Sequence, residues 1–311
     1  MNYKKPITFT LAGILLFSTL FGQNDTIKIS PADTTTVLQT DTTKVPRAAD
    51  TIRIGGMIII KRGGNENKRQ TTVTIGNKRK QRHSNISTAN WIIDLGFSNY
   101  SDKTDYTSAT TEGYIINKPG SPALGENDFK LKTGKSVNVN IWFFMQRINL
   151  IKHYVNLKYG LGIELNNYRF KTNISFNEGG SNPYDLSQNI AHPFAFRDSI
   201  AFSKNKLAAD YATIPFMINF RTHPNSSKKG ISLSAGVSAG YLYSSRNKQR
   251  SDERGKEKNR GDYDLQRWKF SYIAELGLGP ARLYGSYSPK SIFENGLKMM
   301  PYNVGIRLSN W

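Results

Sequence analysis

The feature that most constrains this chain is a regular alternation of apolar and polar residues, repeated in long rows from Trp91 onward. From Val155 to Leu165, every second residue is apolar, and asparagine, lysine, glycine and glutamate stand between them. Successive side chains of a β-strand point to opposite faces, so this period of two predicts strands with one apolar face. Comparable rows begin at Trp91, Val137, Ile231, Phe270 and Tyr302.

Two further segments alternate less regularly. In Leu207–Arg221 the apolar residues change phase near Ile214-Pro215, and because proline lacks a backbone donor we expect a bulge there. The segment Ala281–Ser288 is short and mixed. With both included, the sequence predicts eight strands.

The polar positions of these rows distinguish two all-β architectures. A soluble β-sandwich exposes charged residues on its outer face. Here the polar positions are mostly glycine, serine and asparagine, which suit the crowded interior of a small barrel. The apolar rows are about 10 residues long, enough for a tilted strand to cross the hydrocarbon layer. We therefore predict an all-β fold, an eight-stranded antiparallel up-and-down transmembrane β-barrel at residues 91–311. The low mean hydropathy of −0.51 is compatible with it, because only alternate residues face lipid.

The connections between the predicted strands alternate in length, as in outer-membrane barrels, which have short periplasmic turns and long outer loops. Strands one and two, three and four, and five and six are joined by about 35, 38 and 20 residues, and the connections between these pairs are short. We expect aromatic girdles at the two ends of the strands, formed by the following residues: Tyr100, Tyr168, Tyr241, Tyr243, Trp268, Trp142, Tyr154 and Tyr302.

The N-terminal region predicts export. Lys4 and Lys5 precede an apolar stretch, Leu11–Phe21, that is too short to span a bilayer, so residues 1–22 resemble a signal peptide cleaved near Gly22. Residues 23–90 are rich in Asp, Thr, Lys and Arg and are predicted to form a mostly unstructured periplasmic extension. Two β-rich runs around Gly55-Gly56 indicate a hairpin at residues 51–61.

Composition limits the partners. The formal charge is +20, but an exported protein meets lipid phosphates and lipopolysaccharide rather than nucleic acid. The chain has no cysteine, which excludes disulfides and thiolate metal sites. We expect no metal and no cofactor. The expected partners are outer-membrane lipid, lipopolysaccharide, the barrel-assembly machinery, and a periplasmic or envelope protein that binds residues 23–90.

Six ionisable residues fall on inward-facing positions: Asp94, Lys158, Glu164, Lys269, Glu275 and Arg307. Their mixed signs favour a structural salt-bridge network that fills the barrel, with a narrow conducting pore as the alternative. The charged segment Arg246–Arg260 is compatible with binding lipopolysaccharide phosphates, although a disordered, solvated loop is the preferred interpretation. The aromatic-rich loop Phe176–Phe202 is expected to pack over the barrel mouth or to meet a partner.

The histidines do not indicate catalysis. His153 and His223 lie in or beside predicted turns, His192 lies in a long loop, and His83 lies in the extension. A general base must be within hydrogen-bond reach of the proton that it abstracts, and none of these is on a strand beside a candidate nucleophile. We therefore predict no catalytic residues.

The eight-strand layout, the stretch Leu207-x-x-x-Tyr211-x-x-Ile214-Pro215 and the terminal Trp311 resemble outer-membrane β-barrel domain proteins of Bacteroidota. That group includes OmpA-like small barrels and PorT-like proteins linked to secretion. The resemblance covers about residues 90–311 and implies that Trp311 is a C-terminal assembly signal. Trp311 is one residue out of phase with the row that begins at Tyr302, which departs from the usual pattern.

These observations predict an outer-membrane barrel with a structural or partner-docking role in the cell envelope and no catalysis. The alternative is a transport function, either a narrow channel or an accessory component of a secretion system of the PorT-like kind.

Overall fold

The computed structural model describes residues 50–54, 57–62, 70–75, 84–223 and 230–309, in two compact units, Met1–Gln81 and Arg82–Trp311. In the first unit, strands β1 (Asp50–Ile54), β2 (Met57–Arg62) and β3 (Gln70–Ile75) form an antiparallel sheet in that order. β1 and β2 pair where the sequence predicts a hairpin, whereas β3 was not predicted. The signal peptide with its cleavage near Gly22, most of the extension, His83 and the proposed assembly signal Trp311 lie outside the described residues.

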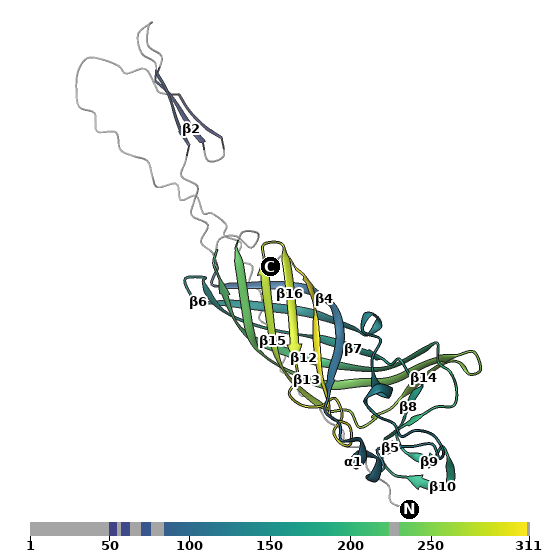
Figure 1. Cartoon of the computed structure of the whole chain (residues 1–311). Helices are drawn as coiled ribbons and strands as arrows, with labels where there is room; N and C mark the ends of the chain where they lie inside the picture. Colours follow the sequence, from purple (N-terminus) through teal and green to yellow (C-terminus); the bar gives the residue numbers. More distant parts are fainter. Residues whose placement is uncertain (1–49, 55–56, 63–69, 76–83, 224–229, 310–311) are drawn as a thin grey trace, which may run out of the picture. The chain divides into compact units, whose positions relative to one another are not determined.

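The second unit is built around a ring of eight strands (Figure 1). Each strand pairs antiparallel with the next along the chain, and the last pairs with the first. The predicted fold class, an eight-stranded antiparallel up-and-down barrel, is therefore confirmed. The strands are β4 (Ile86–Asp102), β6 (Val137–Ile151), β7 (Val155–Arg169), β12 (Lys204–Arg221), β13 (Ile231–Ser251), β15 (Trp268–Leu278), β16 (Ala281–Tyr287) and β17 (Met299–Leu308).

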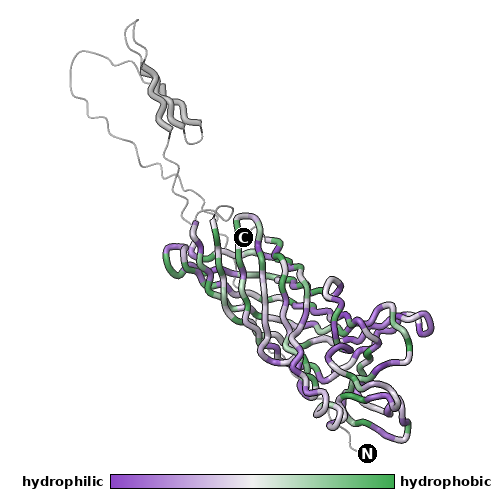
Figure 2. Tube along the Cα trace, viewed as in Figure 1, coloured by the Kyte–Doolittle hydropathy of each residue, from purple (hydrophilic) through white to green (hydrophobic). Residues whose placement is uncertain are grey.

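The alternation seen in the sequence becomes the two faces of this barrel. On β4 the Phe97 side chain is 54% exposed on the outer surface, whereas Asp94 and Ser98 are fully buried inside. Figure 2 shows this as hydrophobic and hydrophilic residues that follow one another along each strand. An apolar outer wall around a polar interior is the arrangement expected of a barrel in lipid. Among the described residues, no helix has the length and apolarity needed to cross a membrane.

The interior is crowded, which explains the glycines of the inward rows. A Cβ atom added to Gly96 on β4 would lie 2.5 Å from the Val304 carbonyl oxygen and closer still to the Tyr284 hydroxyl. Such contacts require neighbouring atoms to move. Small residues at these positions therefore let adjacent strands and a buried tyrosine approach each other.

The two ends of the barrel differ in the length of the connections between strands. At one end, here called the turn end, β6–β7, β12–β13 and β15–β16 are joined by short connections. At the other, the loop end, four loops connect the strands, at residues 103–136, 170–203, 252–267 and 288–298. We call these four loops together the cap. Several strands run well past the predicted ends on this side, and β13 extends to Ser251.

The cap contains short elements of secondary structure. They are α1 (Tyr106–Thr111), β5 (Ile115–Ile116), η1 (Glu126–Phe129), η2 (Thr133–Lys135), β8 (Ile174–Asn177), β9 (Gly180–Asn182), β10 (Asp185–Ile190), β11 (Phe194–Arg197) and β14 (Gly255–Arg260). Strands β5, β11 and β8 form a small sheet, and β9 pairs with β10. Asp105 caps α1, because its side chain accepts hydrogen bonds from the Thr107 and Ser108 backbone nitrogens.

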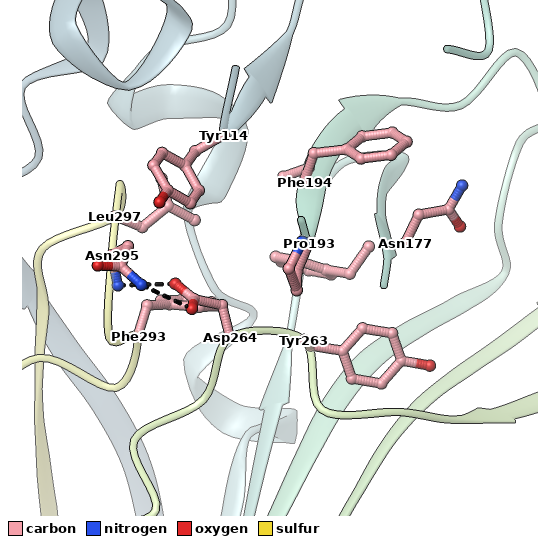
Figure 3. A pocket seen from close by; sticks show the side chains of 11 residues that line it. Tyr114, Asn177, Pro193, Phe194, Tyr263, Asp264, Phe293, Asn295 and Leu297 are labelled. Atoms are coloured by element: carbon pink, nitrogen blue, oxygen red, sulfur yellow. Dashed lines mark hydrogen bonds between the residues drawn. The ribbon is translucent and has the colours of Figure 1, made fainter. Parts of the chain in front are cut away.

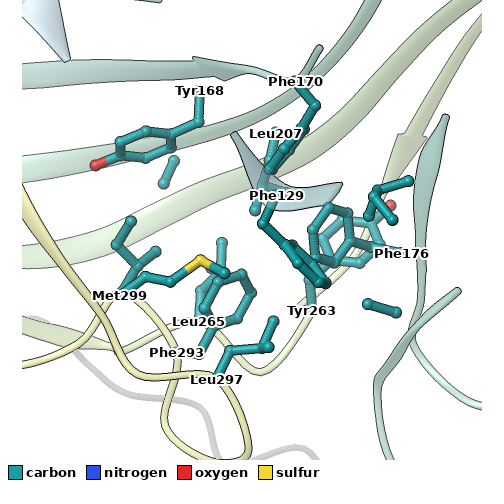
Figure 4. Packing of buried hydrophobic residues seen from close by; sticks show 14 of the residues in the cluster. Phe129, Tyr168, Phe170, Phe176, Leu207, Tyr263, Leu265, Phe293, Leu297 and Met299 are labelled. Carbon is teal, nitrogen blue, oxygen red and sulfur yellow. The ribbon is translucent and has the colours of Figure 1, made fainter. Parts of the chain in front are cut away.

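A hydrophobic core lies at the loop end and combines residues of all four loops with residues of the barrel strands (Figure 4). Phe129 and Leu265 are fully buried, and Phe176 stacks on Phe293 with ring centroids 5.8 Å apart. Burial of such side chains provides the largest favourable contribution to folding of a water-exposed unit. The loop Phe176–Phe202 was expected either to pack over the barrel mouth or to meet a partner. Phe176 and Phe194 are both buried at the barrel mouth, in agreement with the first role.

The expected phase change on β12 is wrong. Odd-numbered residues face inward along the whole strand: Leu207 and Tyr211 in the cap core, Met217 and Asn219 further along. The irregularity lies instead at Asp210/Tyr211, where the β12–β13 register skips Tyr243 on β13. The sequence of β12 shows an apparent phase change because the inward residues are apolar at the loop end, whereas further along the strand the apolar residues are the outward ones, such as Ile214 and Phe216.

The expectation of a disordered, solvated loop at Arg246–Arg260 is also wrong. β13 continues through this segment and pairs with β14, in register from Arg246 opposite Arg260 to Ser251 opposite Gly255. Figure 1 shows this hairpin projecting beyond the ring at the loop end.

The aromatic girdles are present only in part. Tyr154, Tyr241, Tyr243, Trp268 and Tyr302 are exposed on the outer surface, between 38% and 54%. Tyr168 and Trp142 are instead buried inside, at 2% and 5%, and Tyr100 packs against the cap core. The inward positions of Tyr168 and Trp142 follow from their strand phase.

Candidate functional site

The barrel interior brings together all six ionisable residues singled out from the sequence. Arg307 on β17 lies among them and makes two hydrogen bonds to Asp94 on β4, from Nε to Oδ1 at 2.6 Å and from Nη2 to Oδ2 at 2.8 Å. This bidentate geometry is the strong form of an arginine–carboxylate pair. Nη1 of Arg307 also contacts Glu275 on β15.

The remaining charges are paired as well. Lys158 on β7 contacts Glu275, and Lys269 on β15 contacts Glu164 on β7. The six side chains are at most 8% exposed. Three carboxylates therefore face three cations, and the network is neutral. An unpaired charge buried at such a position would be strongly destabilising, whereas a balanced set is tolerated.

Neutral side chains complete the network. Asp94 accepts hydrogen bonds from Trp142 Nε1 at 2.7 Å and Asn140 Nδ2 at 3.3 Å. Glu164 accepts from Asn166 Nδ2 at 3.1 Å and Asn303 Nδ2 at 3.3 Å. These roles were not predicted from the sequence, although the inward phase of the asparagines was visible in the rows. The guanidinium of Arg307 also lies 5.7 Å from the centroid of the Trp142 ring.

Little space remains between the side chains at the level of this network. Trp142, Met217, Tyr284 and Arg307 border a cavity in which the centre of a water molecule can occupy about 30 Å³. That volume corresponds to about two water molecules. The interior geometry therefore supports a filled barrel, as expected where eight strands leave room only for side chains.

The turn end of the interior is positively charged. Arg147, Arg221 and Arg282 come from β6, β12 and β16 and interact electrostatically with one another. Their strand positions share the inward face, because Arg147 pairs with Lys158 and Arg282 pairs with Gly277. This cluster was not predicted from the sequence, because its members lie far apart in the chain.

The cap contains a shallow hollow to which all four loops contribute (Figure 3). Tyr114, Phe194, Asp264 and Phe293 line it, one from each loop. Only about 20 Å³ of it is open to the centre of a water molecule, so it holds no more than one or two waters.

Asp264 is the acidic group of this hollow. Its carboxylate accepts hydrogen bonds from the backbone nitrogen and Nδ2 of Asn295, at 2.7 and 2.9 Å. Partial burial raises the pKa of Asp264, and the Asn295 hydrogen bonds oppose that shift. Tyr263 and Asp264 both have positive φ, 52° and 55°, in a turn closed by the Leu265 nitrogen and the Asp262 oxygen at 3.1 Å. Because a bulky side chain rarely adopts this conformation, burial of Tyr263 in the core must hold the turn.

The three described histidines occupy separate parts of the molecule. The His192 ring packs tilted against the Tyr114 ring with centroids 4.5 Å apart, His223 contacts the Thr222 hydroxyl at 3.1 Å, and His153 lies in the β6–β7 turn. Within residues 84–223 and 230–309, no three His, Cys, Asp or Glu side chains gather as a metal site would require.

The family follows from a sequence comparison. The profile described as "Outer membrane protein beta-barrel domain" matches residues 77–289, more than half of the chain. The chain belongs to this family. It is therefore an outer-membrane β-barrel protein, in agreement with its apolar outer wall.

Comparison with solved structures identifies the attachment invasion locus protein Ail of Yersinia pestis. That structure is 13% identical, covers 71% of this chain and 98% of Ail, and has a TM-score of 0.29. A second Ail structure, in complex with the heparin analogue sucrose octasulfate, is also 13% identical and covers 71% of this chain and 100% of Ail, with a TM-score of 0.27. No curated protein matches the chain.

Proposed function

We propose that this outer-membrane barrel is a structural or partner-docking protein of the cell envelope and has no catalytic activity. The observation that carries this proposal is the interior, where three carboxylates and three cations pair with one another. A barrel filled in this way presents its surfaces, rather than its interior, to other molecules. We place the loop end outside the cell and the turn end in the periplasm, since outer-membrane barrels have long outer loops and short periplasmic turns.

The docking role would use the region before the barrel. We propose that residues 1–22 are removed near Gly22, that the predicted extension reaches from residue 23 up to β4 in the periplasm, and that a periplasmic or envelope protein binds there. Trp311 would be the signal read by the barrel-assembly machinery. The resemblance of the chain to OmpA-like small barrels of Bacteroidota supports this proposal.

The docking proposal is tested by affinity purification from cross-linked outer membranes. The full chain and a variant that lacks residues 23–83 but keeps residues 1–22 would be compared, because the deletion leaves β4 intact. We expect the full chain to retain a periplasmic or envelope protein that the deletion loses, with equal amounts of folded barrel on a mild SDS gel. Identical co-purifying proteins from the two chains would contradict docking through the extension.

A second candidate function is transport, as a narrow channel or as an accessory component of a secretion system, as in PorT-like proteins. The cluster of Arg147, Arg221 and Arg282 favours it, because a cationic opening would attract anions. Liposome swelling separates the two candidates. Swelling in small anionic solutes that is lost on replacing Arg282 with glutamine would support transport, and no swelling would support the filled barrel.

A further inference from the structure

The hairpin of β13 and β14 carries cations directly opposite one another. Its register pairs Arg246 with Arg260, Lys248 with Lys258, and Arg250 with Lys256. The rows continue onto β12 and β7, where Lys204 pairs with Arg250, Lys206 pairs with Lys248, and Arg169 pairs with Lys206. Directly paired residues project from the same face of a sheet. We call these residues the cationic ladder: Arg169, Lys204, Lys206, Arg246, Lys248, Arg250, Lys256, Lys258 and Arg260.

The opposite face of the same strands is fixed against the cap. Asn205, Asn247 and Gln249 are buried there, at no more than 6% exposure. Gln249 Nε2 donates to the Ser175 hydroxyl at 2.7 Å, and Asn205 Nδ2 donates to the Thr172 carbonyl oxygen at 3.2 Å. The cationic ladder therefore faces outward, on the surface that lower down presents Ile214 and Phe216 to lipid.

Like charges directly opposite each other destabilise a sheet. In the described part of the chain, Arg246 alone of the nine cations forms an ion pair, with Asp210. The nearby Asp198 is paired with Arg254, at 3.0 Å, and Glu257 pairs with Gln249 on the other face. The Nε atoms of Arg169 and Arg246 are buried and make no hydrogen bond. The protein supplies too few carboxylates for this surface, which points to anions from outside the chain.

The position of the ladder relative to the membrane indicates which anions these are. Tyr241, Tyr243 and Trp268 are exposed at 46–54%, and Tyr241 packs on Trp268 with ring centroids 5.0 Å apart. Exposed aromatic residues of this kind mark the headgroup level. Arg246 follows Tyr243 by three residues, about 10 Å along a strand. The ladder thus begins at the headgroup level of the outer leaflet and extends away from the membrane.

We propose that the cationic ladder binds phosphate groups of lipopolysaccharide in the outer leaflet. Neighbouring cations of a row are about 4.8 Å apart and successive rows about 7 Å apart, so each phosphate can contact two or more cations. Lipopolysaccharide is anchored beside the barrel and presents several phosphates on one molecule. This inference rests on the proposed envelope role and deepens it, by naming the lipid that the outer surface holds.

The test uses the full chain folded in a mild detergent. Lipid A with both phosphates and the same lipid A after dephosphorylation are titrated, and binding is measured by microscale thermophoresis. The variant Lys206→Gln, Lys248→Gln, Lys258→Gln, here called the middle-row variant, neutralises three of the four cations of the middle row and keeps Arg169. We expect it to bind phosphorylated lipid A about 10-fold more weakly than the native chain, because it loses three charge contacts at the surface, each of modest strength. Dephosphorylated lipid A should bind both proteins equally weakly.

The matched control is Lys118→Gln, Lys130→Gln, Lys290→Gln, which removes the same charge from exposed positions elsewhere in the cap. It should bind within about 2-fold of the native chain. All three proteins should show the same mobility shift on a mild SDS gel, because the replaced side chains project from the surface. Equal affinity of the middle-row variant and the control would overturn the proposal, as would equal binding of both forms of lipid A.

A further readout distinguishes a binding surface from a solvated one. Without lipid A, relief of like-charge repulsion should slow hydrogen exchange in the β13–β14 hairpin of the middle-row variant. With phosphorylated lipid A, the native hairpin should become the slower of the two. Absence of this reversal contradicts the proposal. Failure of the docking role would appear instead as identical co-purifying proteins from the full chain and the variant without residues 23–83, a comparison in which both chains keep the ladder.

Discussion

The two halves of the second unit are built from the same strands and have opposite interiors. In the barrel, the inward residues are charged or amide side chains around Arg307, and the outward residues are apolar. In the cap, the inward residues form an apolar core around Phe129, and the outward face of the strands carries the cationic ladder. The surroundings explain the difference: lipid accepts an apolar wall, whereas water requires that apolar groups be buried.

Strand β12 crosses from one environment to the other without changing phase. Its inward residues are Leu207 and Tyr211 in the cap and Asn219 in the barrel, and its outward residues change from Lys206 to Phe216. Side-chain polarity alone therefore does not determine which face of a strand is inside. The position of the residue relative to the membrane must be known as well.

The largest loss of stability is expected when the ion-pair network inside the barrel is disrupted. Asp94→Ala leaves Arg307 with Glu275 only and should lower the free energy of unfolding by about 3–5 kcal/mol, the usual cost of breaking a buried pair. Urea unfolding in lipid vesicles measures it. The double variant Asp94→Ala, Arg307→Met removes both charges and leaves Glu275 paired with Lys158. It should recover more than half of the loss; a double variant as unstable as the single would mean that the charges are not coupled.

The next effect is expected in the cap. Phe129→Ala removes a fully buried ring, which packs 5.8 Å from the Tyr106 ring, and should destabilise the cap by about 3 kcal/mol. Limited proteolysis of the loops should become faster, while the barrel keeps its mobility shift on a mild SDS gel. The outward-facing Phe97→Ala is the control and should leave proteolysis of the cap unchanged. Loss of the barrel's mobility shift in Phe129→Ala would show that the two interiors do not fold independently.

A smaller effect should follow from crowding in the barrel. Gly96→Ala places a methyl group against the Tyr284 hydroxyl and the Val304 carbonyl, and overpacking of this kind costs about 1–3 kcal/mol. Urea unfolding again measures it. Gly125→Ala in the cap meets no atom within 4 Å and should change stability by less than about 0.5 kcal/mol. Equal effects of the two substitutions would refute the crowded interior.

The smallest effect concerns the carboxylate of the cap. Its folded-state pKa is raised, mainly by burial, so Asp264 holds its proton more tightly when folded. Stability of the cap should therefore fall as the pH rises from about 4 through the raised pKa. Asp264→Asn should remove this dependence and stabilise the cap at pH 7 by less than about 1 kcal/mol, because the group is partly exposed and solvent screens its charge. Proteolysis of the loops between pH 4 and 7 checks this, and an unchanged pH profile in the variant would contradict it.

The barrel was predictable because each strand carries its own signal. Period-two rows such as Val155–Leu165 place Lys158 and Glu164 inward without knowledge of any neighbour. The same rows identified all six interior charges, although which carboxylate meets which cation depends on the strand register.

The cap was not predictable in the same way. Its core joins residues far apart in the chain, such as Tyr114, Phe176 and Phe293, and no local sequence pattern predicts that they come together. The hairpin at Arg246–Arg260 was misassigned because its dense charge is typical of a solvated loop. Its order comes from buried amides such as Gln249, whose partner Ser175 lies in another loop.

Single-channel recording of the full chain in planar bilayers would show whether paired charges fill the barrel. The filled interior predicts no conductance steps in the native chain, because the cavity bordered by Trp142, Met217, Tyr284 and Arg307 holds about two waters. Steady, reproducible conductance steps from the native chain would show an open path through the barrel and contradict a filled interior.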